Sequence, residues 1–182
     1  MTSKTTTIDK PVSGQKLALV IGIWDYQNEG VRKLTNPEND AKDITLVLER
    51  IGFSVTTNLN LAYWDMAKAC DEFRKKIQPG DMVLFYFAGH GKQWNAMDAK
   101  VGSLIAFACA PGTIASDGEN ERNGLFTKYL LKHLETPNED IRMILADVTK
   151  EVMIKSNMKQ LPFLSAALTQ KNIYLCGQPQ SK

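Results

Sequence analysis

The sequence has 182 residues, enough for one domain with a sizeable core and too few for two full domains. Apolar residues make up 43% and charged residues 23%, as in average globular chains, which excludes a disordered, collagen-like or coiled-coil protein. The 22 basic and 20 acidic residues give a net charge of +2 without a block of one sign. We therefore expect a folded protein without an electrostatic surface for nucleic acid.

The cysteines and the N-terminus indicate the compartment. Three cysteines, an odd number without a CxxC pair, favour free thiols in a reduced, cytoplasmic setting. Residues 1–14 are polar and lack the apolar core of a signal peptide, and no stretch approaches the ~18 apolar residues of a membrane span. We expect flexible tails over residues 1–14 and 178–182, one domain over residues 15–177, and no membrane partner.

Strands and helices alternate in the first half of the chain. The continuous apolar run at residues 17–23 predicts a strand that is buried on both faces. Asn36-Pro37 predicts the start of a helix that ends at Gly52. Residues 53–57 predict a second strand, followed by a helix whose buried face runs from Met66 to Ile77.

The same alternation continues in the second half. Residues 81–88 predict a third buried strand, residues 104–109 another, and residues 125–134 a helix. Residues 136–139 predict a capping box for a helix that reaches Val152, and residues 172–176 predict a final strand. This order predicts an α/β fold with a mostly parallel sheet covered on both faces.

His90 is the first candidate for chemistry. It follows the predicted strand over residues 81–88, and ligands of open α/β sheets bind beyond the carboxyl ends of the strands. Gly89 and Gly91 leave the imidazole uncovered, which suits a proton acceptor. A plain loop histidine in a glycine turn is the alternative interpretation.

The other histidine and the cysteines have mainly structural interpretations. His133 lies near a helix C-terminus, where it complements the helix dipole. Cys70 and Cys176 fit core positions, whereas Cys109 ends a predicted strand at the functional edge and is a candidate for a reactive thiol. No spacing indicates a zinc site, and the residues after the first strand match no phosphate-binding loop.

Five segments together resemble the caspase-like cysteine peptidases, particularly metacaspases, paracaspases and orthocaspases. They are the strand LALVIGI with Tyr26, the segment LTNPENDA from Leu34, the Gly52-Phe53 turn, the run FYFAGHG, and the run LIAFACAPGTIASDG with NGLFTKYLLKHL. The resemblance implies a thiol protease, a hydrolase that acts on protein or peptide substrates. It also implies a three-layer α/β/α sandwich on a six-stranded sheet, with His90 as the catalytic histidine.

The nucleophile of that family is missing from this sequence. The family carries it on a cysteine at the end of the fourth strand, but only residues 89–103 separate the histidine strand from the next apolar strand. A parallel crossover alone needs about a dozen residues or more, so the fourth strand does not fit. We expect one central strand to be absent, with the truncation near residues 94–102. Cys109 matches the fifth strand, and we expect it to be inert.

The resemblance also suggests a substrate pocket. Asp40 and Asp117 match acidic residues of relatives that cleave after Arg or Lys, and paired carboxylates suit a guanidinium. From its position alone, Asp40 is equally a first-turn acid that complements a helix dipole. No cofactor or metal is expected, and neither a calcium requirement nor the oligomeric state is readable from the sequence.

Two functions follow from these observations. The first is a caspase-like cysteine endopeptidase domain that is inactive or weak because the nucleophile segment is absent. The second is a pseudo-peptidase that binds a protein partner through the retained cleft or surface.

Overall fold

The computed structural model describes residues 14–26, 30–31, 33–91, 99–111, 115–116 and 121–177. Strands and helices alternate in the order expected from the sequence. The elements are β1 (Lys16–Gly22), α1 (Pro37–Arg50), β2 (Ser54–Leu59), α2 (Tyr63–Arg74), β3 (Met82–Ala88), β4 (Leu104–Phe107), α3 (Leu125–His133), α4 (Ile141–Lys155) and β5 (Phe163–Ala166).

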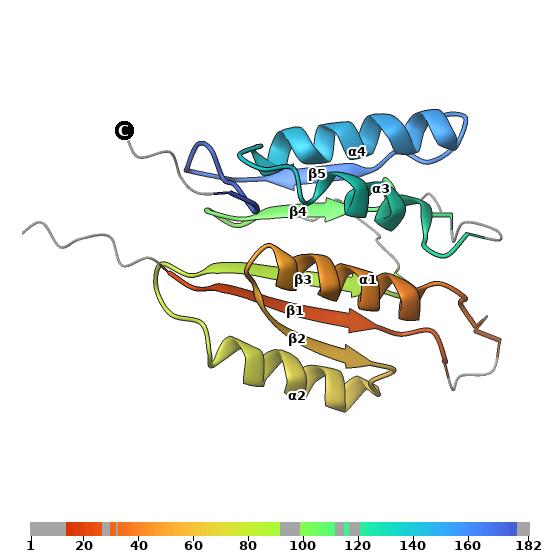
Figure 1. Ribbon diagram of the computed structural model, residues 1–182. Helices are drawn as coiled ribbons and strands as arrows, with labels where there is room; N and C mark the ends of the chain where they lie inside the picture. The colour runs from red at the N-terminus through yellow and green to blue at the C-terminus, as the bar shows by residue number, and fades with distance from the viewer. Residues whose placement is uncertain are drawn as a thin grey trace, which may run out of the picture.

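The first three strands form a parallel sheet in the order β2-β1-β3. The buried side chains form two hydrophobic cores, a larger and a smaller one, on opposite faces of the central strand β1. Ala18 and Val20 lie in the larger core, and Leu19 and Ile21 lie in the smaller core. This cover on both faces explains why β1 is a continuous apolar run. The larger core holds side chains of α1, α3 and α4, whereas α2 contributes Phe73 to the smaller core. The three layers are therefore α2, the sheet, and the group α1, α3 and α4 (Figure 1).

The last two strands, β4 and β5, form a separate antiparallel pair in the described part of the chain. Here the sequence prediction was wrong in one respect, because the final strand expected over residues 172–176 is only an isolated bridge between Asp140 and Tyr174. The ladder partner of β4 is the short run Phe163–Ala166, which follows Pro162. Four residues carry too little periodicity to reveal such a strand in the sequence.

Helix α4 begins later than its predicted capping box. Its N-cap is Asp140, whose carboxylate accepts a hydrogen bond from the Arg142 backbone N–H, and not Thr136. Asp140 also accepts from the backbone N–H of Ile173 at 3.1 Å. One carboxylate thus starts the helix and holds the C-terminal segment beside it.

No described residue pairs β3 with β4. Strand β3 bonds to β1 along one edge, and β4 bonds to β5 along one edge. In place of the six-stranded sheet implied by the resemblance, the described residues form one sheet of three strands and one of two. Figure 1 shows β3 and β4 running in the same direction, with β4 beyond β3. Residues 92–98, where an extra strand would have to begin, lie outside the described residues.

One face of β3 also lacks the helical cover that β1 has. Val83, Phe85 and Phe87 lie opposite Leu17, Leu19 and Ile21 of β1, on the face that α2 covers. The β1 residues are buried, whereas the three β3 side chains are 42%, 57% and 37% exposed. Helix α2 therefore covers only part of its face of the sheet.

None of the described helices is both long and apolar enough to cross a membrane.

Candidate active site

His90 lies at the carboxyl edge of the parallel sheet. It is the second residue after β3, and Ala88 at the end of β3 pairs with Gly22 at the end of β1. The loops that follow β1 and β2 meet at the same edge, because Asn60 Oδ1 accepts from the backbone N–H groups of Trp24 at 3.0 Å and Asp25 at 3.2 Å. This edge is where a parallel α/β sheet holds ligands.

Tyr26 holds the backbone and the ring of His90. Its hydroxyl oxygen accepts a hydrogen bond from the His90 backbone N–H at 2.6 Å, and the two rings lie 4.8 Å apart between centroids with 53° between their planes. Burial raises the pKa of Tyr26 above its ordinary value of 10.0, although the hydrogen bond from His90 opposes this shift. The hydroxyl therefore stays neutral near pH 7. The sequence analysis names Tyr26 only as part of a segment that resembles the family and does not predict its contact with His90. The position of Tyr26 just beyond β1, the strand that pairs with β3, could have indicated this contact.

Gly89 makes this arrangement possible through close approach. A Cβ at position 89 would lie 2.7 Å from the Tyr26 hydroxyl oxygen and 3.1 Å from the carbonyl oxygen of Ile23. The first separation is too short for a carbon atom and the second is tighter than an ordinary contact, so any other residue would require its neighbours to shift. At Gly91, in contrast, a Cβ would meet no atom of the described residues beyond its chain neighbours within 4 Å.

Asp40 lies in the first turn of α1, but its carboxylate serves a different helix. The side chain is 6% exposed and accepts hydrogen bonds from the Gly124 backbone N–H and the Thr127 hydroxyl, both at 3.1 Å. Gly124 is the N-cap of α3, so the negative charge lies at the positive end of that helix. Thr127 also contacts the Tyr86 hydroxyl at 2.7 Å, and burial, followed by the charge of Asp40, raises the pKa of Tyr86.

Asp117, the second acidic candidate, lies outside the described residues. The neighbouring Ser116 is described, and its backbone N–H donates to Oε1 of Gln160 at 2.9 Å. Gln160 is 2% exposed, and its Nε2 donates to the carbonyl oxygen of Ala108 at 2.7 Å. Gln160 thus ties the residue before Cys109 to the residue before Asp117, a role that the sequence did not reveal.

The remaining histidine and the cysteines lie on different elements. His133 contacts Glu151 at 2.9 Å on the surface formed by α3 and α4, which fits its structural interpretation. Cys70 packs against the smaller core and Cys176 against the larger one. Cys109 is half-buried beyond the end of β4. The described residues contain no group of three or more side chains that could hold a metal ion.

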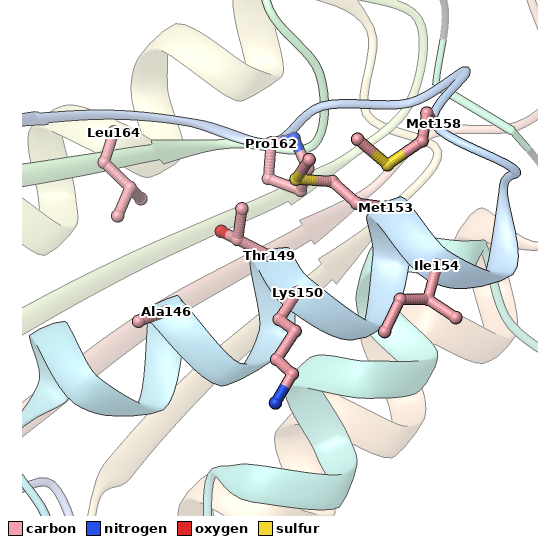
Figure 2. A pocket seen from close by; sticks show the side chains of 8 residues that line it. All are labelled: Ala146, Thr149, Lys150, Met153, Ile154, Met158, Pro162 and Leu164. Carbon is pink, nitrogen blue, oxygen red and sulfur yellow. The ribbon is translucent and has the colours of Figure 1, made fainter.

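Two hollows lie outside the His90 edge. A cavity of about 730 Å³ lies between β3 and β4, and it is lined by residues 80–86 and by side chains of α1, α3 and α4. A groove of about 580 Å³ lies between α4 and the segment that leads into β5 (Figure 2). Figure 2 shows Met153, Met158 and Pro162 gathered at one end of the groove, while Lys150 points away from them.

The comparisons with known proteins agree with the fold. A family model described as "Caspase domain" matches residues 15–103 and 94–174. The chain is 36% identical to human mucosa-associated lymphoid tissue lymphoma translocation protein 1 over 149 residues, which are 82% of this chain and 17% of that protein. The mouse homologue is 35% identical over 142 residues, 78% of this chain and 16% of the homologue.

Solved structures give the same result. The chain resembles the crystal structure of caspase-1 from Spodoptera frugiperda with a TM-score of 0.74 at 17% identity, covering 97% of each chain. It also resembles the structure titled pro-sf-caspase-1, with a TM-score of 0.69 at 16% identity, covering 98% of this chain and 99% of that one.

This chain belongs to the caspase-domain family. The resemblance inferred from its five segments is confirmed, as is the three-layer α/β fold class. The chain spans about a sixth of the length of the two curated relatives.

Proposed function

We propose that this chain is a caspase-type cysteine endopeptidase domain that keeps the catalytic histidine and lacks the strand that carries the nucleophile. The observation that supports this proposal is the sheet: β3 leads into His90, but no described residue pairs with its other edge. The family model matches in two pieces that overlap at residues 94–103, which fits a deletion in that region. The chain then cleaves proteins weakly or not at all.

The chemistry explains why one missing residue matters. In an intact member, the imidazole accepts the proton of the cysteine thiol, the thiolate attacks the peptide carbonyl, and backbone N–H groups stabilise the oxyanion. His90, whose backbone N–H is held by the Tyr26 hydroxyl at the carboxyl edge of the sheet, suits the first of these steps. The proposed loss of the nucleophile strand removes the thiol that would supply this proton.

The preference for Arg or Lys remains part of the proposal through Asp40 and Asp117. Asp40 already accepts two hydrogen bonds within the fold, so a substrate guanidinium would share its carboxylate with them. Its low exposure also limits the approach of a guanidinium. Asp117 therefore makes the larger contribution to the proposed pocket.

The test is a peptidase assay on the purified chain with fluorogenic peptides that end in Arg, Lys or Asp. We expect no turnover above that of His90→Ala, and His133→Ala serves as the matched control because its imidazole contacts Glu151 instead. Turnover after Arg or Lys that disappears in His90→Ala and persists in His133→Ala would overturn the expected inactivity. Loss of that turnover in Cys109→Ser, but not in Cys70→Ser, would identify Cys109 as the nucleophile.

The origin of the missing segment has its own test. Comparing the transcript with the genomic DNA around residues 94–101 distinguishes a skipped exon from a continuous reading frame. We expect a continuous frame if the chain is a pseudo-peptidase, the second candidate function. The open cavity beside β3 favours that second candidate, because it offers a binding site that needs no thiol.

A further inference from the structure

The cavity between β3 and β4 is bounded by the edge of a strand. All the residues from 80 to 86 line it, including Leu84, which packs against the larger core, and Phe85, which lies on the opposite face of the sheet. Side chains from both faces of one strand border the same space only where that space adjoins the edge of the strand. The opposite wall includes Leu104 and Ala106 of β4, which bonds to β5 along its other edge.

We propose that this cavity binds an extended, uncharged segment of another polypeptide, which adds to the sheet as a strand between β3 and β4. Addition of a strand to an exposed sheet edge is an established mode of peptide recognition. Here the added strand meets a wall on each side, so its main chain bonds to two edges instead of one. The lining residues 82–86, which belong to β3, extend over about 16 Å at ~3.3 Å per residue, which matches a strand of about five residues.

The lining determines the chemistry of the segment. One wall is apolar, with Ile44 and Leu48 from α1 and Leu130 from α3. The acidic side chain in the lining, Asp81, is already engaged: its carboxylate accepts from the backbone N–H groups of Gln15 and Gln78, both at 2.8 Å. A charged side chain entering this space would lose its hydration without gaining a partner. The side chains that point inward must therefore be apolar.

The outward side chains of the segment face an apolar surface as well. They would lie beside Val83 and Phe85, which the sheet leaves exposed because α2 does not reach them. A Val-, Ile- or Leu-rich segment without charge thus fits both faces, as expected of a strand buried inside a parallel sheet.

The residues at both ends of the printed sequence do not match the apolar lining of the cavity. Residues 1–13 read MTSKTTTIDKPVS and residues 178–182 read QPQSK, and both are polar. A second copy of the chain that pairs edge to edge through β3 would satisfy β3 alone and leave β4 unpaired. Edge-to-edge pairing with a second copy therefore does not fit the cavity, and we assign the cavity to an apolar segment of a different polypeptide.

The probe is a fluorescein-labelled peptide, Lys-Lys-Gly-Val-Ile-Val-Leu-Val-Ile-Gly-Lys-Lys, acetylated and amidated at its ends. One control peptide carries Pro at the central Val, which removes a backbone N–H, and another carries Asp there. Binding to the full chain is followed by fluorescence anisotropy and by amide hydrogen exchange. We expect saturable binding, at least tenfold weaker binding of both controls, and new protection in β3 and β4 but not in β2, the far edge of the same sheet.

Two variants of the protein locate the site. Ala106→Leu fills the cavity from β4 and is expected to weaken binding at least tenfold, whereas Ser54→Leu, an exposed residue on the β2 edge, leaves it unchanged. Circular dichroism checks that each variant is folded. If Ala106→Leu does not fold, the comparison between the proline peptide and the parent peptide decides alone.

Four results would overturn the proposal. They are equal binding of the proline peptide, new protection in β2, a dimer that excludes the peptide, and β3 amides that are already protected along both edges before peptide is added. The inference rests on the strand edges and not on catalysis. Peptide binding without turnover would support the proposed binding site and agree with an inactive peptidase. Turnover without peptide binding would contradict the binding site and would show that the chain is an active peptidase.

Discussion

At the scale of single residues, the carboxylate of Asp40 shows how one side chain can have two plausible roles. Its position in a motif suggests contact with a substrate, whereas its contacts with Gly124 and Thr127 join the first turn of α1 to the start of α3. A buried acceptor that pairs with two donors leaves both donors unsatisfied when it is removed. The structural role is therefore open to measurement without any substrate.

We expect Asp40→Ala to lower the free energy of unfolding by about 1–3 kcal/mol, because the buried Thr127 hydroxyl and the half-buried Gly124 N–H lose their acceptor. Glu38→Ala is the control in the same helical turn; Glu38 makes an exposed ion pair with Lys42, and its loss should change stability by less than about 0.5 kcal/mol. Urea denaturation measures both. Equal stabilities of Asp40→Ala and the parent protein would leave the carboxylate available for substrate binding.

At the scale of elements, Asp140 connects α4 with the C-terminal segment. Its carboxylate accepts from the Arg142 guanidinium and from two backbone N–H groups, those of Arg142 and Ile173. The hydrogen bond from the Arg142 side chain is the main cause of a pKa well below the ordinary value of 3.8, and burial opposes it. The folded state therefore favours the ionised form of Asp140.

The depressed pKa of Asp140 predicts a loss of stability in acid. Its contribution is fully present above the unfolded pKa of 3.8 and is lost as the pH falls toward the lower folded pKa. We expect Asp140→Asn to be less stable than the parent at pH 7, with the difference shrinking between about pH 5 and pH 2. Urea denaturation over this range, with Glu139→Gln as the neighbouring control, measures it. A difference that is independent of pH would exclude the ionic contribution of Asp140.

At the scale of the whole molecule, the described residues form two separate groups of strands, with no pairing between β3 and β4. Each of the two parts is held by its own ladder and by helices that share the larger core. Lys16 adds a link across the fold, because its Nζ donates to the carbonyl oxygens of Ile51 at 3.2 Å and Leu175 at 2.8 Å. The packing of α1, α3 and α4 thus joins the β2-β1-β3 sheet to the β4-β5 pair, which share no strand pairing among the described residues.

The lack of pairing between β3 and β4 among the described residues predicts an alternating pattern of hydrogen exchange along β3. Successive backbone N–H groups of a strand point to opposite edges, so those of β3 that face β1 should exchange slowly and those that face the cavity quickly. All amides of the central strand β1 should be slow, since β1 pairs on both edges. Exchange followed by NMR on the chain alone tests this. Uniform protection of β3 would mean that a strand occupies the cavity in solution.

Most of the fold could be predicted from the sequence, because buried parallel strands are continuous apolar runs and the helices between them repeat apolar residues at helical spacing. The runs at residues 17–23 and 81–88 became β1 and β3, and Asn36-Pro37 began α1. The shortness of the link over residues 89–103 also predicts that a central strand is missing, a prediction that stays untested because residues 92–98 lie outside the described residues. The four-residue strand β5 and the Asp140 cap were missed, since their signals lie in pairing and not in periodicity.

The sequence by itself determined the family, the order of the elements and the place of His90 after β3, because these depend on local patterns along the chain. Only the tertiary structure decided that Tyr26 fixes His90, that Asp40 holds the start of α3, and that Gln160 ties the loop beyond β4. These contacts join residues 44 or more positions apart. No local pattern records them, because the packing of the sheet and helices brings their partners together.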